Sequence, residues 1–228
     1  MARRLARRIR RSGHWNDVSF KTGFARDPDT AAYFDRRASE YDQWYLGEGQ
    51  FAERDRPGWN AEVDQLVDLI GRLAPARTLD VACGSGFLTR HLSGVVAAID
   101  QSPAMVALTQ SRLPHGVVVV GNALNLPFAD QAFDRILTGH FYGHLASDER
   151  RAFLAEARRV AGELIVIDSA LRPGLEPEQW QERILNDGSR HLVYKRYLTG
   201  RQLADEIGGG PILDGTWFVA VQVRWSQP

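Results

Sequence analysis

Short apolar runs alternate with amphipathic segments from residue 60 onward, and this alternation predicts the secondary structure. The apolar runs at residues 77–82, 95–99, 117–120, 133–138 and 164–167 each predict a strand. The four valines at 117–120 are typical of a strand that is buried on both faces. Because the connections between these strands are helical in pattern, we expect right-handed crossovers and a parallel sheet.

Helical periodicity fills the segments between the predicted strands. We expect helices at residues 31–44, 60–73, 87–92, 103–112, 147–160 and 199–207, with Asn60, Ser102 and Ser147 as N-caps. Residues 212–214 and 216–225 are separated by Gly215 and predict two closing strands joined by a tight reversal. The whole pattern predicts a doubly wound α/β fold with a seven-stranded, mostly parallel sheet whose last strand is antiparallel.

Composition limits the class of protein. The 228 residues are 44% hydrophobic and 25% charged, as in ordinary globular proteins. No apolar run is long enough to span a membrane, and the single cysteine cannot form an internal disulfide. The charged N-terminus is not followed by the apolar segment of a signal peptide. These features predict a cytoplasmic protein without a transmembrane segment.

Charge is unevenly distributed, although the net formal charge is zero. Residues 1–11 hold six arginines, which leaves 22 basic residues against 28 acidic ones in the rest of the chain. We therefore expect a basic arm and linker at 1–30 and one domain at 31–228. The arm could contact RNA or an anionic membrane, or could be a solvated terminus. The acidic body disfavours nucleic acid as a partner.

The candidate chemistry begins at the turn after the first predicted strand. Asp80 precedes Gly84 and Gly86 in the run LDVACGSG, and Asp100 ends the next strand. Glycines at a strand-to-helix turn allow a ligand to approach the backbone, and a carboxylate after the second strand suits the hydroxyls of a ribose. This combination predicts a nucleoside ligand.

The type of nucleoside follows from the neighbours of the turn. A dinucleotide fingerprint requires a third small residue where Thr89 stands, and Asp80 would repel a pyrophosphate. The ammonium and sulfonium of S-adenosylmethionine suit Asp80 better, so a nicotinamide oxidoreductase is disfavoured. Alternatively, Asp80 only accepts hydrogen bonds from loop amides.

Three motifs resemble those of class I S-adenosylmethionine-dependent methyltransferases. They are TLDVACGSG, in which Ala82 replaces a glycine and Ser85 a threonine, AAIDQSPAMV, and GNA followed by LNLPFADQAFD. The resemblance implies that Asp100 holds the ribose, that Met105 lies near the adenine, and that Asn122 and Ala123 contact the adenine edge. The cofactor-binding set that it implies is Tyr41, Asp80, Ala82, Gly84, Gly86, Asp100, Gln101, Met105, Asn122, Ala123, Leu124 and Gly139.

The resemblance is strongest to the small single-domain branch that includes ubiquinone and menaquinone C-methyltransferases. It implies a Rossmann-like methyltransferase fold, with the N-terminal helical stretch, including Tyr33 and Tyr41, folded over the cofactor as a lid. The segment after Asp42 and the run 159–163 depart from the quinone-enzyme signatures. The quinone substrate is therefore not carried over.

Residues that could act on the methyl acceptor follow the fourth predicted strand. His140 and His144 are candidate general bases, because imidazole titrates near neutral pH. Either could instead be a packing residue, and a metal pair lacks a third ligand nearby. Asp168 ends the fifth strand and could line the pocket or cap the strand. Cys83 belongs to the glycine turn and is not expected to be a nucleophile.

The sequence therefore predicts an S-adenosylmethionine-dependent methyltransferase that acts on an O, N or C nucleophile of a small molecule. Residues 171–196 are an insertion that we expect to cover the acceptor. Two alternatives stay open at this point. One is an RNA or protein methyltransferase that is guided by the arginine-rich arm, and the other is a non-catalytic module that binds the cofactor. The acceptor and the oligomeric state are not given by the sequence.

Overall fold

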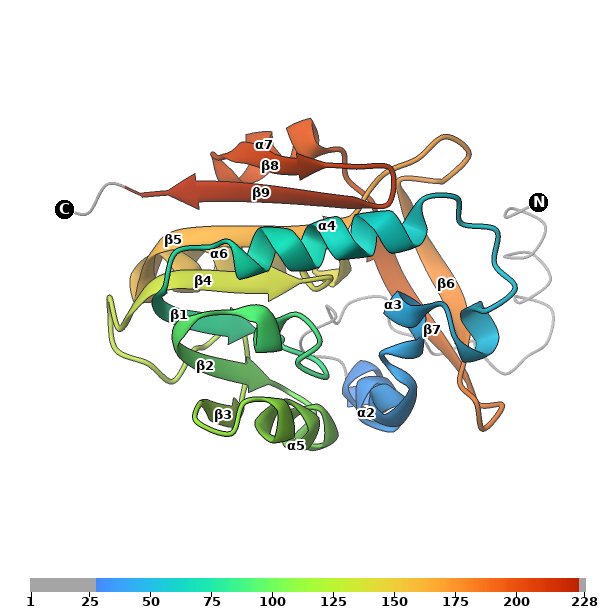
Figure 1. Ribbon diagram of the computed structural model, residues 1–228, viewed down its shortest axis with the longest axis horizontal. Helices are drawn as coiled ribbons and strands as arrows, with labels where there is room; N and C mark the ends of the chain where they lie inside the picture. Colours follow the sequence, from blue (N-terminus) through green and yellow to red (C-terminus); the bar gives the residue numbers. More distant parts are fainter. Residues whose placement is uncertain (1–27, 226–228) are drawn as a thin grey trace.

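A seven-stranded sheet organises the part of the chain that the computed structural model describes, residues 28–225 (Figure 1). The arginine-rich arm lies outside those residues. The strands are β1 (Ala76–Val81), β2 (Gly94–Asp100), β3 (Val117–Val120), β4 (Phe133–Gly139), β5 (Ala161–Ser169), β8 (Gly210–Asp214) and β9 (Phe218–Arg224), in the order β3-β2-β1-β4-β5-β9-β8. β9 runs antiparallel to both of its neighbours, whereas β1 to β5 are parallel. The predicted fold class is confirmed.

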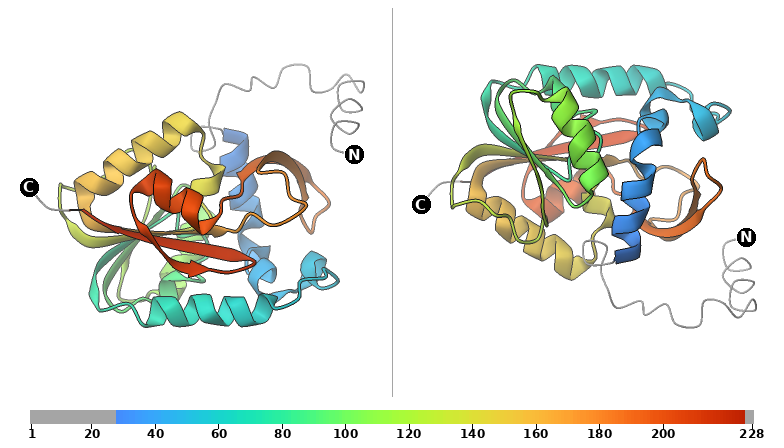
Figure 2. Two further views of the ribbon diagram at one scale, coloured as in Figure 1. Left: turned by 90° about the horizontal axis from the view of Figure 1, so that it is seen from above. Right: turned by 90° about the horizontal axis from the view of Figure 1, so that it is seen from below.

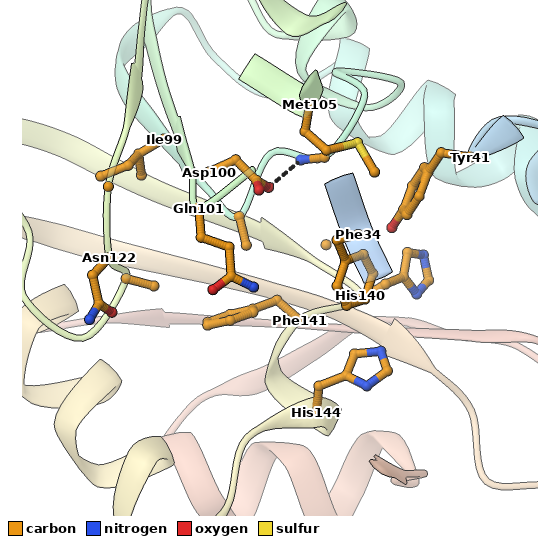
Figure 3. A pocket seen from close by; sticks show the side chains of 15 residues that line it. Phe34, Tyr41, Ile99, Asp100, Gln101, Met105, Asn122, His140, Phe141 and His144 are labelled. Atoms are coloured by element: carbon orange, nitrogen blue, oxygen red, sulfur yellow. Dashed lines mark hydrogen bonds between the residues drawn. The ribbon is translucent and has the colours of Figure 1, made fainter. Parts of the chain in front are cut away.

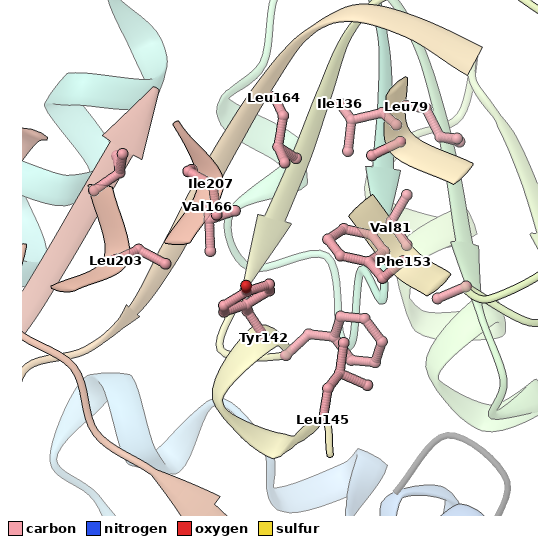
Figure 4. Close-up of a cluster of buried hydrophobic side chains, with 14 of the residues drawn as sticks. Leu79, Val81, Ile136, Tyr142, Leu145, Phe153, Leu164, Val166, Leu203 and Ile207 are labelled. Carbon is pink, nitrogen blue, oxygen red and sulfur yellow. The ribbon is translucent and has the colours of Figure 1, made fainter. Parts of the chain in front are cut away.

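Helices cover both faces of the sheet (Figure 2). α4 (Trp59–Gly71) packs on one face, and α6 (Ser147–Val160) and α7 (Gly200–Ile207) pack on the other. α5 (Pro103–Arg112) contacts β2 and β3. Successive β5 residues point to opposite faces: Leu164 belongs to the core under α6 and α7 (Figure 4), whereas Ile165 belongs to the core under α4. This burial on both faces explains why β5 is almost continuously apolar.

Two further segments lie beyond the carboxyl ends of the parallel strands (Figure 1). The N-terminal segment consists of α2 (Pro28–Arg37), η2 (Ala38–Glu40), α3 (Gln43–Leu46) and η3 (Gly49–Phe51). The insertion forms an antiparallel hairpin of β6 (Glu178–Ile184) and β7 (Arg190–Arg196). The Glu40 carboxylate accepts a hydrogen bond from the Asn186 backbone N–H in the hairpin loop at 2.8 Å, so the two segments meet.

Two expectations about secondary structure are wrong. The helix expected after the glycine turn is absent from the described residues, and the segment before Gly94 contains only the 3-10 turn η4 (Thr89–His91). Gly94 has φ +97° and approaches the Ala76 backbone so closely that β2 begins at once beside β1. The valines of β3 are not buried on both faces, since β3 is an edge strand and Val117 and Val120 are exposed.

Helix starts were predicted with mixed success. Ser102 caps α5, because its hydroxyl accepts from the Met105 N–H at 3.1 Å. Asn60 and Ser147 are not N-caps: α4 starts after Gly58, and α6 starts after Ala146, whose N–H donates to the Glu149 carboxylate. The expected helix at 31–44 is broken between α2 and α3, where Asp42 is held by hydrogen bonds to Ser85 and Arg112.

Candidate functional site

A pocket opens at the carboxyl ends of β1, β2 and β4, with α2 and η5 (Tyr142–His144) beside it (Figure 3). Its empty space, open mouth included, is about 560 Å³. The predicted residues that line it are Tyr41, Ala82, Gly84, Asp100, Gln101, Met105, Asn122, Ala123, Gly139, His140 and His144. Most of the predicted residues therefore meet in one pocket, and four residues that the sequence did not indicate complete its lining: Phe34, Ile99, Gly121 and Phe141.

The carboxylate of Asp100 is the best-defined polar group of the pocket. It accepts hydrogen bonds from the backbone N–H groups of Gly84 and Ser102, both at 2.9 Å. Burial raises the pKa of Asp100, and hydrogen bonds from the backbone N–H groups of Ser102, Gly84 and Gln101 oppose the shift. A carboxylate has about four acceptor positions, so Asp100 can still accept from a ligand's hydroxyl group. This geometry fits a ribose.

The glycine turn brings backbone close to the space beside Asp100. Gly84 has φ +56°, and a Cβ atom there would lie 3.5 Å from the Tyr41 ring. Tyr41 thus packs over the turn, and its ring also lines the pocket. Ala82, with φ +57°, adopts the same left-handed region without being a glycine. Such a conformation is held only where the surrounding structure fixes it, as in binding loops.

Amide and apolar groups form the far end of the pocket. The Asn122 Oδ1 accepts from the Leu124 N–H at 2.8 Å, which orients the amide in a short turn. Leu124 therefore lies outside the lining and supports Asn122. Met105 is fully buried on the first turn of α5 and lines the pocket. An amide group and apolar side chains in one pocket are suited to the polar edge and the flat face of a purine.

His140 is buried among aromatic rings. Its ring centroid lies 4.7 Å from Trp44 and 5.5 Å from Phe218, and within residues 28–225 neither ring nitrogen has a hydrogen-bond partner. Its Nδ1 lies 4.0 Å from the Asp168 carboxylate. Burial lowers the pKa of His140 to about 3, so the imidazole is neutral at pH 7.

His144 has a defined tautomer. Its Nδ1 lies 2.6 Å from the Tyr194 carbonyl oxygen. A carbonyl oxygen only accepts, so the proton is on Nδ1, and Nε2 is the basic nitrogen. Burial lowers the pKa of His144 well below its usual value. The two histidines line the pocket together, as the sequence suggested, although η5 is a 3-10 turn and His140 precedes it.

Comparison with known proteins agrees with this arrangement. Residues 79–163 match the family model described as a methyltransferase domain. Over 114 residues the chain is 34% identical to the demethylmenaquinone methyltransferase of Thermotoga maritima, covering 46% of this chain and 48% of that protein. It is 36% identical over 139 residues to phthiotriol/phenolphthiotriol dimycocerosates methyltransferase 1 of Mycobacterium ulcerans, covering 55% of this chain and 47% of that protein. The chain spans about half the length of these relatives.

A solved structure extends the likeness beyond the matched residues. The DhpI–SAM–HEP complex superposes with a TM-score of 0.67 and 22% identity, covering 86% of this chain and 96% of that one. The match over residues 79–163 and the shared fold support the predicted class I S-adenosylmethionine-dependent methyltransferase family and its cofactor.

Two residues of the first motif do not line the pocket. The Asp80 carboxylate accepts from the Thr89 hydroxyl at 2.5 Å, and burial raises the pKa of Asp80 to about 7. Asp80 accepts from this hydroxyl rather than from loop amides, and its expected contact with the cofactor stays a prediction. Gly86, with φ +78°, lies against Thr109 of α5, where a Cβ atom would be 3.1 Å from the Thr109 Cα.

Behind the histidines, the methyltransferase fold contains a buried ion pair that the sequence analysis missed. Asp168 and Lys195 form a close ion pair, with side chains 1% and 3% exposed. Asp168 also accepts from the Gly143 N–H at 2.7 Å, which holds η5 beside the end of β5. Asp168 thus supports the pocket from behind. Lys195 had no sequence signal, because it lies in the insertion, 27 residues from its partner.

The described residues offer neither a metal site nor a reactive thiol. Residues 28–225 contain no group of three His, Cys, Asp or Glu side chains that could hold a metal ion. Within the described part of the chain, no helix has the length and hydropathy needed to cross a bilayer. Cys83 is buried, and burial raises the pKa of its thiol well above the usual value. A thiol in that state is a poor nucleophile.

Stability should depend on pH through His140. In the unfolded chain the imidazole titrates near 6.5, whereas in the folded chain its pKa is about 3. The unfolded state therefore binds more protons between these values, and the free energy of unfolding falls as the pH falls below 6.5. From pH 7.5 to 5, we expect a loss of about 2 kcal/mol from this residue, measurable by urea denaturation.

The variant His140→Asn should show a smaller loss than wild type over this pH range. Asparagine tolerates the left-handed backbone conformation that His140 adopts at φ +58°. His115→Asn, a change at an exposed position, is the matched control and should keep the wild-type dependence. Equal pH dependence in His140→Asn and wild type would contradict the prediction.

Proposed function

We propose that the chain binds S-adenosylmethionine in this pocket and transfers its methyl group to a small-molecule nucleophile. The observation that carries the proposal is the division of one pocket into two chemically different ends. Asp100 and Asn122 are at one end, and His140 and His144 are at the other (Figure 3). The first end suits a nucleoside, and the second suits the acceptor.

The residues at the cofactor end would bind the cofactor and hold its methyl group in place for transfer. Asp100 would accept from the ribose hydroxyls while it fixes Gly84, and Asn122 would use its amide toward the adenine. The ring of Tyr41 packs over the glycine turn and could lie against the sulfonium by cation–π attraction. The bound cofactor supplies an electrophilic methyl group. Alignment and exclusion of water then make the largest contribution to such a displacement.

The acceptor residues would handle the proton. His144 presents Nε2 as its basic nitrogen, because Nδ1–H donates to the Tyr194 carbonyl. We infer that His144, rather than His140, is the base when the acceptor is a hydroxyl or an acidic carbon. His140 has neutral, unpartnered nitrogens in an aromatic surrounding and would shape the site. The lowered pKa of His144 makes it a weak base, which suits an acceptor that is already activated.

Buried walls favour a small acceptor over a macromolecule. Phe34, Tyr41 and the histidines enclose the acceptor end, and Glu40 ties the N-terminal segment to the hairpin loop. An RNA or protein methyltransferase guided by residues 1–11 stays an alternative, as does a module that binds the cofactor without turnover. One fold can carry several activities, so the acceptor must be tested directly. The cytoplasmic location likewise stays a prediction.

Calorimetric titration with S-adenosylmethionine and with NADH tests the cofactor. We expect micromolar binding of S-adenosylmethionine only. Transfer of a radioactive methyl group is then measured with cell extract divided into fractions below and above 3 kDa. Incorporation from the small fraction supports the proposal. Incorporation only into large material supports the alternative guided by the arm, and binding without transfer to either fraction supports the non-catalytic module.

A further inference from the structure

Three arginine side chains gather between the N-terminal segment and the hairpin, next to the acceptor end of the pocket. The Arg37 guanidinium lies 5.0 Å from the centroid of the Tyr41 ring, which lines the pocket. It also lies 6.0 Å from the Phe51 ring, and Arg54 lies 4.6 Å from the same ring. Arg37 and Arg54 therefore share one aromatic neighbour.

Arg183 reaches the same place from the hairpin. It pairs with His191 in the β6–β7 register, and the His191 ring lies 5.1 Å from Tyr33. The Tyr33 hydroxyl accepts from Arg37 Nη1 at 2.6 Å. Residues of β6 alternate between exposed and half-buried, and Arg183 is on the half-buried face, in register with the buried face of β7. Arg183 Nη2 also donates to Gln181 Oε1 at 3.2 Å. Arg183 thus lies on the same hairpin face as His191, which contacts the Tyr33 ring that Arg37 also reaches.

These arginines differ from nearby cations in their ion pairing. Within residues 28–225, none of the three forms an ion pair, although nearby cations do: Lys195 with Asp168, Arg196 with Glu206 and Arg190 with Glu182. Arg37 is only 6% exposed. Burying a guanidinium without an anion is unfavourable, so this arrangement favours an anion from outside.

Electrostatic effects on the neighbours agree with this placement. Burial lowers the pKa of Arg54, and Arg183 and Arg37 lower it further. The same two charges depress the pKa of His140, after burial and Lys195. The arginines are therefore close enough to influence one another and the acceptor end of the pocket. Arg54 is exposed, Arg183 is half-buried and Arg37 is buried, so positive charge extends from solvent toward the site.

We propose that Arg37, Arg54 and Arg183 bind an anionic group, a carboxylate or a phosphate-like oxyanion, on the methyl acceptor. Guanidinium groups form paired hydrogen bonds with both kinds of oxyanion. The anion would neutralise the triad and hold the acceptor with its nucleophile toward His144. The inference rests on the proposed function, because it specifies the acceptor of that same pocket. It makes the three arginines specificity-determining residues.

Anion binding is tested on the full chain saturated with S-adenosylhomocysteine. Inorganic phosphate and succinate are titrated separately by calorimetry, with chloride used to keep the ionic strength constant. Arg54→Gln and Arg183→Gln should each weaken binding of the better anion by about tenfold, because each removes a charge-assisted contact. Arg190→Gln is the matched control, since Arg190 is an exposed arginine of the same hairpin paired with Glu182.

The outcomes separate the inference from the proposed function. Saturable binding of either anion that is weakened in both variants and kept in the control supports the triad, and the better anion identifies the type of oxyanion. Absence of saturable binding, or equal weakening in Arg190→Gln, overturns it. S-adenosylmethionine is titrated in the same preparations. If the wild-type protein binds the cofactor but neither anion, only the inference about the three arginines is wrong. If the wild-type protein does not bind the cofactor, the proposed function is wrong. Unchanged melting temperatures confirm that the variants are folded.

Discussion

Replacing Asp100 with alanine should weaken S-adenosylmethionine binding by about 100-fold or more. A hydrogen bond to a charged group contributes about 1.5–3 kcal/mol, and the proposed site gives the carboxylate such a bond to the ribose. The substitution also releases the N–H groups of Gly84 and Ser102, which the carboxylate now holds at 2.9 Å. Calorimetric titration of wild type and variant measures the difference directly.

The control for this variant is Asp134→Ala. Asp134 is also an aspartate in a strand and also accepts hydrogen bonds, but they come from the backbone N–H and the side chain of Arg77, and neither residue lines the pocket. The Asp134→Ala variant should bind the cofactor with an affinity within about twofold of wild type. Substitutions at such surface sites usually change stability by less than about 0.5 kcal/mol, and this one is outside the pocket. If Asp100→Ala also bound within threefold of wild type, the ribose assignment would be wrong.

Replacing Lys195 with methionine should lower the free energy of unfolding by about 3–5 kcal/mol. The substitution keeps much of the side-chain volume but leaves the Asp168 carboxylate, 1% exposed, without its cation. The N–H groups of Gly143 and Ser169 still donate to it, but they do not neutralise its charge. Urea denaturation at pH 7.5 gives the change in unfolding free energy.

Two further variants establish the cause of that loss. Arg190→Met removes an exposed cation from the same strand and should change stability by no more than about 0.5 kcal/mol. The double variant Lys195→Met with Asp168→Asn should recover part of the loss, because it removes both members of the buried pair. A loss below about 1 kcal/mol in Lys195→Met would mean that water or another group solvates Asp168.

The sheet could be predicted because its signals are local. Each strand from β1 to β5 is an apolar run between turn residues, and Gly215 marks the reversal between β8 and β9. The hairpin had no such signal. In β6, Trp180 and Ile184 point outward with 48% and 40% of their surface exposed, while Arg183 is on the inner face. Apolar residues here face solvent and a charged residue faces inward, which is the reverse of the usual strand pattern. The sequence alone therefore did not indicate that this segment is a strand covering the site.

The same contrast divides the candidate site. The cofactor end is built from loops that follow β1, β2 and β3. Its residues therefore lie in short sequence motifs, such as the turn with Gly84 and the end of the next strand at Asp100, which can be recognised from the sequence. The support of the acceptor end comes from separated segments. Asp168 and Lys195 meet only because β5 and β7 end beside η5, and chain spacing could not indicate that contact. Long-range pairing of charges depends on tertiary structure.

The place of β9 has a consequence for protein synthesis. β8 leaves the ribosome before β9, yet β9 lies between β5 and β8 and pairs with both. Until β9 emerges, the edge of β5 is open and β8 has no neighbour in the sheet. An apolar strand with an unpaired edge is a template for wrong association between chains. A released chain that ends near residue 215 should therefore depend on chaperones more than the full-length chain.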